Sequence, residues 1–218
     1  MVPNEPPTQK HGLLLFCAPL LVALTIIMAP VFGQLLSSLT AVLALMLLYW
    51  CGCWALVLLV APRKELVALY RTVPNRRPIE LILTWLPPVA TFAIVFLHTL
   101  SYISWAVLAV VMLVALVNGI TEELFWRGTF VAAFPRSLRL GYLYPLLWFS
   151  AWHIALSLLP GIHYQGGALA LIGGAAALGL GWGWVVWRTR DLRSVTIAHL
   201  ATNFFAFTGL ALANWPNP

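Results

Sequence analysis

The sequence is poor in charged residues. Only 8% of its 218 residues are Asp, Glu, Lys or Arg, whereas 62% are hydrophobic. A typical soluble domain carries about 25% charged residues. This composition excludes a disordered chain, a nucleic-acid-binding domain and an ordinary cytosolic enzyme, and it indicates an integral membrane protein. In such a protein the net charge of +6 marks cytoplasmic loops and does not indicate binding of nucleic acid.

Cysteine is scarce as well. The chain has three cysteines, Cys17, Cys51 and Cys53, and all of them lie within apolar runs. Their number is odd, and Cys51 and Cys53 point in different directions if that run is helical. Neither a disulfide framework nor a cysteine zinc site fits this pattern, so we expect packing roles for all three.

Seven apolar runs predict an all-α fold, a polytopic bundle of about seven transmembrane helices. The runs cover residues 13–32, 39–61, 81–97, 102–120, 142–158, 168–187 and 195–213. We expect the first run to be retained as a span and the bundle, residues 12–213, to form a single domain. Flexible tails are expected over residues 1–11 and 214–218. Gly179 and Gly183 form a G-x-x-x-G pair in the sixth run, which predicts close helix packing.

Basic residues fall on one side of these runs. They precede the first run or lie between runs two and three, four and five, and six and seven: Lys10, Arg63, Lys64, Arg71, Arg76, Arg77, Arg136, Arg139, Arg188, Arg190 and Arg193. The other loops carry no Lys or Arg, and Arg127 is the single exception to the pattern. The positive-inside rule makes this side cytoplasmic, so the amino terminus is predicted to be cytoplasmic.

Few ionisable residues lie close to or within the apolar runs. They are Glu122, Glu123, Arg127, His153 and His199, accompanied by the amides Asn118 and Asn203. A charged group inside a membrane costs about 2.5–3.5 kcal/mol on insertion scales, so it persists where it is paired or functional. By contrast, Glu80 and Asp191 fall in loops or at the edges of runs, and we expect them to be solvated.

The two adjacent glutamates are predicted to have different partners. On a helix, Glu123 and Arg127 are four residues apart and share a face, with the glutamate in the favourable N-terminal position. Glu122 is rotated about 100° from Glu123. An unpaired Glu122 flanked by Leu, Phe and Trp has the character of a general base. The alternative is that both glutamates lie at the membrane interface and pair with Arg127.

The histidines lie on two further runs. His153 is about 11 residues into the fifth run, near the middle of the bilayer. His199 and Asn203 are four residues apart and share a face of the seventh run. Packing or helix bridging would explain either element alone. Glu122 and His153 reach the same depth only if the fourth helix is longer than its apolar run and continues to Phe134, which the sequence leaves open.

Three motifs on three different runs carry a resemblance to a known family. They are E-E-x-x-x-R from Glu122, F-x-x-x-H from Phe149 and H-x-x-x-N from His199. Together and in this order they resemble the CPBP family of intramembrane proteases, the CAAX-protease and bacteriocin-processing group that includes the Ras-converting CAAX endopeptidase. The resemblance covers residues 118–203.

The resemblance implies an intramembrane endopeptidase of the glutamic type, with its site open toward the cytoplasmic side. Glu122 and His153 would match the pair that activates water, and His199 and Asn203 the residues that stabilise the oxyanion. Glu123, Arg127 and Phe149 would match the supporting residues. The implied substrate is a peptide or protein with a hydrophobic or lipid-modified terminus, presented in the lipid bilayer; the oligomeric state stays open.

No metal or cofactor is expected, although zinc held by Glu122, His153 and His199 is the alternative, because two His and one Glu are an acceptable catalytic zinc set. The metal-free mechanism is favoured because no H-E-x-x-H pair is present. The only aspartate is Asp191, which excludes an aspartyl intramembrane protease, and Ser150 lacks the surrounding turn of a serine hydrolase.

Two other classes of function stay open. A channel, transporter or immunity factor could use the buried polar residues as a path for a solute. A lipid-modifying hydrolase could use the same groups on a different substrate.

Overall fold

The computed structural model describes residues 9–215, and this part of the chain contains helices and no strand. The helices are α1 (Gln9–Leu35), α2 (Ser38–Val60), α3 (Arg63–Arg71), α4 (Pro78–Thr91), η1 (Phe92–Phe96), α5 (Leu97–Thr99), α6 (Trp105–Glu122), η2 (Glu123–Thr129), α7 (Phe130–Ala133), η3 (Arg139–Leu143), α8 (Tyr144–Ser157), α9 (Gly167–Thr189) and α10 (Leu192–Asn214); η marks π-helical segments. The predicted all-α fold is confirmed. The predicted tails lie mostly outside the described residues, but Gln9 already begins α1 and Asn214 ends α10.

Six helical stretches in the described residues are long and apolar enough to cross a membrane. They are Gln9–Leu35, Ser38–Val60, Pro78–Thr99, Trp105–Ala133, Gly167–Thr189 and Leu192–Asn214. The fifth predicted span, residues 142–158, corresponds to α8, whose 14 residues continue directly from η3 and lie within the same bundle. The chain is therefore an integral, multi-pass membrane protein, with one span shorter than the apolar pattern predicted.

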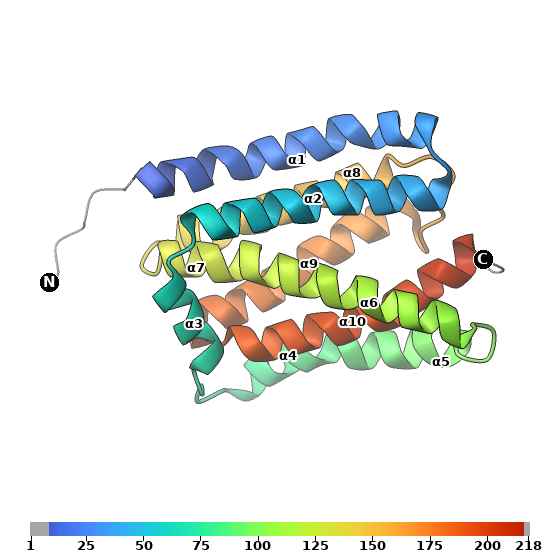
Figure 1. Cartoon of the computed structure of the whole chain (residues 1–218). Helices are drawn as coiled ribbons and strands as arrows, with labels where there is room; N and C mark the ends of the chain where they lie inside the picture. The colour runs from blue at the N-terminus through green and yellow to red at the C-terminus, as the bar shows by residue number, and fades with distance from the viewer. Residues whose placement is uncertain (1–8, 216–218) are drawn as a thin grey trace, which may run out of the picture.

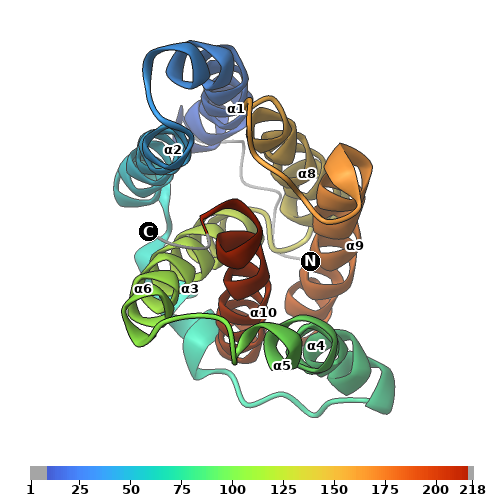
Figure 2. The ribbon, with the colours of Figure 1, turned by 90° about the vertical axis from the view of Figure 1, so that its right-hand side faces the viewer.

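The bundle is arranged around α10. Figure 2, which looks along the bundle, shows α10 near the middle, with α6, α4 and α9 around it and with α1, α2 and α8 farther away. α10 contacts α6 and α4, while α1 contacts α2 and α8. A Cβ atom added at Gly119 of α6 would lie 2.8 Å from a methyl carbon of Leu200, so α6 and α10 approach each other closely.

The predicted close packing at the G-x-x-x-G pair is confirmed. A Cβ atom at Gly179 would lie 2.8 Å from Leu146 and 3.0 Å from Phe149, and one at Gly183 would lie 2.8 Å from Tyr142. These two glycines let α9 lie directly against η3 and α8, which carries Phe149 and His153.

The fourth span is longer than its apolar run. It continues through α6, η2 and α7 as a stretch of 29 residues, from Trp105 to Ala133. Glu122 ends the 18-residue α6 and therefore lies well inside this stretch. The longer helix removes the difference in depth between Glu122 and His153 that the apolar run alone would create. The π-helical segment η2 begins at Glu123, and such segments are frequent at functional sites.

Positive charge gathers at one end of the bundle, which we call the basic end. Here α1, α4 and α10 begin and α2, α7 and α9 end (Figure 1). Glu80 and Asp191 lie here too, and the expectation that they are solvated is wrong, since they are 1% and 0% exposed. Glu80 pairs with Arg188 and Asp191 with Arg76. The partners are more than a hundred residues apart in the sequence, so each ion pair joins two different loops or helix ends.

Candidate active site

The carboxylate of Glu122 lies at the centre of the site, with the residue only 1% exposed. Its Oε1 accepts hydrogen bonds from the Tyr49 hydroxyl at 3.1 Å and from Nε1 of Trp152 at 3.0 Å. Its Oε2 accepts one from Nδ2 of Asn118 at 2.9 Å. The expectation that Glu122 is unpaired in apolar surroundings is therefore wrong. The aromatic residues around it contribute polar atoms as well as apolar surface.

Glu123 points to a different set of partners. Its Oε1 lies 3.0 Å from Nη1 of Arg127, so the predicted pair at four-residue spacing is present. Both residues are buried, at 0% and 4% exposure. The Arg127 guanidinium also lies over the ring of Phe149, with 4.0 Å between its Cζ atom and the ring centroid. Phe149 thus contacts the supporting pair through a cation–π interaction.

His199 links the two glutamates. Its Nδ1 is 2.7 Å from Oε1 of Glu123, and its Nε2 is 3.4 Å from Oε2 of Glu122. A neutral imidazole can donate to only one of these carboxylates, whereas a protonated ring can donate to both. Two carboxylates, one guanidinium and one imidazole are thus held together inside the bundle.

His153 lies beside this group on α8 and is half-buried. Its Nδ1 is 2.9 Å from the carbonyl oxygen of Phe149. Because a carbonyl only accepts, Nδ1 must carry the proton, and Nε2 of a neutral ring is left as an acceptor. His153 lies within electrostatic range of Glu122, Arg127 and His199, but its hydrogen bond goes to Phe149 and not to Glu122.

Asn203 lies one helical turn beyond His199 on α10 and is 8% exposed. Its Nδ2 has no hydrogen-bond partner among the described residues. A buried amide donor without a partner costs free energy and calls for an explanation. A ligand oxygen that accepts from Nδ2 would satisfy it.

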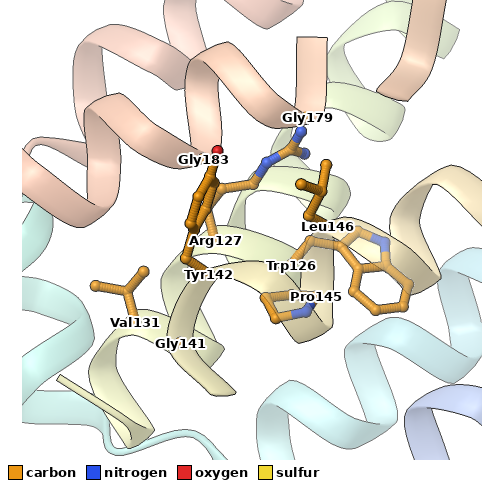
Figure 3. Close-up of a pocket in the computed structure, with 9 residues that line it drawn as sticks. All are labelled: Trp126, Arg127, Val131, Gly141, Tyr142, Pro145, Leu146, Gly179 and Gly183. Carbon is orange, nitrogen blue, oxygen red and sulfur yellow. The ribbon is translucent and has the colours of Figure 1, made fainter. Parts of the chain in front are cut away.

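A small cavity lies beside the supporting pair, between η2, η3 and α9 (Figure 3). Its lining includes Trp126, Arg127, Tyr142, Gly179 and Gly183. The Arg127 side chain crosses the cavity towards Gly179 in Figure 3. The cavity touches neither Glu122 nor the two histidines, so it is adjacent to the site rather than part of it.

The zinc alternative would require Glu122, His153 and His199 to converge on one point. Among the described residues, no group of three or more His, Cys, Asp or Glu side chains is arranged to hold one. The alternative with zinc at Glu122, His153 and His199 needs three ligands at about 2.0–2.2 Å from one point. Oε1 of Glu122 already accepts hydrogen bonds from Tyr49 and Trp152.

The sequence interpretation missed the contribution of α2, because its apolar run reads as a generic span. Trp50 donates to Oδ1 of Asn118 and Trp54 to Oγ1 of Thr121, both at 2.9 Å. Tyr49 lies on the same helix and donates to Glu122. The available signal was a hydroxyl and two indole N–H groups in the middle of an apolar run, since such groups need partners in a membrane.

Comparison with known proteins agrees with the motifs. Residues 103–205 match the model of the family described as type II CAAX prenyl endopeptidase Rce1-like. All three motifs lie inside this range, and α2 lies outside it. No curated protein and no solved structure matches the chain. The predicted family resemblance is thus confirmed over residues 103–205.

Proposed function

We propose that this protein is an intramembrane glutamic endopeptidase that hydrolyses a peptide bond near a hydrophobic or lipid-modified protein terminus. The family match supports a CAAX-type endopeptidase in general, and the six long apolar helices support a membrane setting. The observation that carries the finer proposal is a buried carboxylate, Glu122, beside His199, together with the unpartnered amide donor of Asn203 one helical turn beyond His199.

The hydrogen bonds of Glu122 indicate where a water molecule would bind. An ionised carboxylate has about four lone-pair sites. Tyr49, Trp152 and Asn118 occupy three of them. The remaining site is on Oε2, the oxygen that lies 3.4 Å from Nε2 of His199. A water bound there would be hydrogen-bonded to the Glu122 carboxylate, which would act as its base. Glu122 is 1% exposed, so this water would be buried within the bundle.

The reaction then follows from the residues present. Glu122 takes a proton from the bound water as the resulting hydroxide attacks the carbonyl carbon of the peptide bond, with His153 Nε2 as a second acceptor that orients the water. Nδ2 of Asn203 donates to the developing oxyanion, and the His199 ring lies beside it as a further polar group. The proton held by Glu122 passes to the leaving amine as the C–N bond breaks. Glu123 and Arg127 hold His199 in place.

The substrate class comes from the family name, which specifies a prenyl endopeptidase. We propose a substrate with a prenylated or similarly lipid-bearing terminus, anchored in the same bilayer. The site would be open toward the basic end of the bundle, which the charge pattern predicts to be cytoplasmic.

The direct test is cleavage of a prenylated peptide by the purified protein in nanodiscs. The Glu122→Gln variant keeps the shape of the side chain but loses the base, so its kcat should fall by roughly 10²–10⁴. Glu65→Gln, on an exposed face of α3, is the matched control and should cleave like wild type. Full activity of Glu122→Gln would rule out the mechanism, and preferential hydrolysis of a phospholipid would favour a lipid hydrolase.

A chelator distinguishes the metal-free mechanism from the zinc alternative. Because no step above uses a metal, we expect cleavage to persist after prolonged dialysis against a strong chelator, with metal analysis confirming its removal. Loss of cleavage that added Zn²⁺ restores would overturn the metal-free mechanism.

A further inference from the structure

The hydrogen bonds around Glu122 extend to a helix that lies outside the family match. α2 lies beside α6 and η2 (Figure 1), and it contacts both. Tyr49 and Trp50 are 0% and 8% exposed, so both are buried at this contact. Each is connected to a different oxygen of the Glu122 carboxylate.

The first connection reaches Oε1. Nε1 of Trp126 donates to the Tyr49 hydroxyl oxygen, and this hydroxyl lies 3.1 Å from Oε1 of Glu122. An indole N–H can only donate, so the Tyr49 hydroxyl accepts from Trp126 and its own proton is free to point at Glu122. The Tyr49 ring is stacked on that of Trp152, with 3.8 Å between centroids and 7° between planes. Stacking therefore holds two donors to Oε1 side by side.

The second connection reaches Oε2. Nε1 of Trp50 donates to Oδ1 of Asn118 at 2.9 Å, and Nδ2 of Asn118 donates to Oε2 of Glu122 at 2.9 Å. Amide oxygen and nitrogen are distinguished by their partners. Because the indole only donates, Trp50 fixes the oxygen of Asn118 towards α2 and its nitrogen towards Glu122. The two connections together control both carboxylate oxygens.

We propose that Tyr49 and Trp50 of α2 are positioning residues for the peptidase, acting on Glu122 directly and through Asn118. Tyr49 donates to the carboxylate, and Trp50 turns the Asn118 amide so that it donates too. They thereby stabilise the ionised carboxylate and fix the plane in which its fourth lone-pair site lies. The catalytic unit therefore includes α2 in addition to the matched segment 103–205. This inference rests on the proposed function of Glu122.

Trp54 provides a matched control. It lies one helical turn beyond Trp50 on the same helix, and its indole also donates to a side chain of α6 at 2.9 Å. Its acceptor is Thr121, which has no hydrogen bond to Glu122 among the described contacts. Trp50→Phe and Trp54→Phe thus remove the same kind of bond between the same two helices, and only the first disturbs the carboxylate.

The experiment compares kcat, KM and melting temperature for Tyr49→Phe, Trp50→Phe and Trp54→Phe on a prenylated peptide in nanodiscs. Tyr49→Phe removes a hydrogen bond to the carboxylate, and Trp50→Phe frees the Asn118 amide that makes another. We therefore expect kcat to fall about tenfold or more in both variants. KM should change little, since ground-state binding of the peptide is untouched. Trp54→Phe should keep the kcat of wild type while lowering the melting temperature comparably to Trp50→Phe.

Two results would overturn the inference: wild-type kcat in both Tyr49→Phe and Trp50→Phe, or an equal loss of kcat in Trp50→Phe and Trp54→Phe. If Tyr49→Phe does not fold, the comparison of Trp50→Phe with Trp54→Phe decides alone. Failure of the proposed function gives a different result, in which Glu122→Gln retains cleavage whatever the α2 variants do.

Discussion

Glu122 and Glu123 are neighbours in the chain, yet their carboxylates meet different partners. The rotation of about 100° between successive helical residues directs Glu123 to Arg127 and Glu122 to donors from α2 and α8. His199 contacts both carboxylates. One glutamate is therefore held in a salt bridge, while the other keeps an oxygen available beside an imidazole.

Asn203 is the residue for which the proposed role predicts the cleanest kinetic effect. Replacing Asn203 by Ala removes an oxyanion donor, and kcat should fall by about 10²–10³ with the helix intact. Thr202→Val is the control, because Oγ1 of Thr202 donates only to the carbonyl of Ala198 in the same helix. Steady-state kinetics on the prenylated peptide measure both variants. An unchanged kcat for Asn203→Ala would remove the residue from the mechanism.

At the scale of single residues, the sequence predicts motif members better than it predicts their partners. The Glu123–Arg127 pair follows from helical spacing alone. The contacts of Glu122 with Tyr49 and Trp152 do not, because they depend on how three helices are packed together. The same reason explains Glu80, whose carboxylate meets Arg188 from a helix end more than a hundred residues away.

At the scale of helices, the embedded charges hide the true length of the fourth span. Glu122, Glu123 and Arg127 interrupt the apolar run, although the helix continues to Ala133. These side chains are buried against other helices and do not face lipid, so the membrane does not end the helix at the charges. A hydropathy pattern therefore places the end of a span too early where a functional site begins.

The close approach of α6 and α10 is what brings Glu122 within 3.4 Å of His199. Gly119→Leu would push against Leu200, where even a Cβ atom would lie at 2.8 Å. We expect this variant to lose most of its kcat and to melt at a lower temperature. Gly173→Leu in α9 is the control, because nothing lies within 4 Å of its added Cβ.

Both variants gain the same helix propensity from replacing glycine, so the comparison isolates the effect of helix separation. Equal activity of Gly119→Leu and Gly173→Leu would show that the distance between α6 and α10 does not control the site.

At the scale of the whole molecule, the all-α class, the order of the spans and a count close to the observed one follow from the apolar runs, because a helix satisfies its own backbone hydrogen bonds inside lipid. The runs did not predict that the fifth span is short, nor that α10 lies near the middle of the bundle. Those features depend on close contacts such as Gly119 against Leu200 and Gly183 against Tyr142.

The orientation of the molecule is predicted by its charges and can be measured. Val73 and Tyr102 are 83% and 73% exposed and lie in loops at opposite ends of the bundle. Introduced singly into a cysteine-free background, Val73→Cys should react with an impermeant maleimide from the cytoplasmic side and Tyr102→Cys from the other side. Labelling in the reverse pattern would contradict the positive-inside assignment.

The central claim is that Glu122 activates water and does not itself attack the peptide bond. Single-turnover cleavage of a prenylated peptide in water labelled with ¹⁸O, followed by mass spectrometry of the product and of the protein segment that contains Glu122, tests it most directly. The account predicts one ¹⁸O atom in the new carboxylate of the product and none in Glu122. Label in the Glu122 side chain, or a product whose new carboxylate lacks the label, would contradict it.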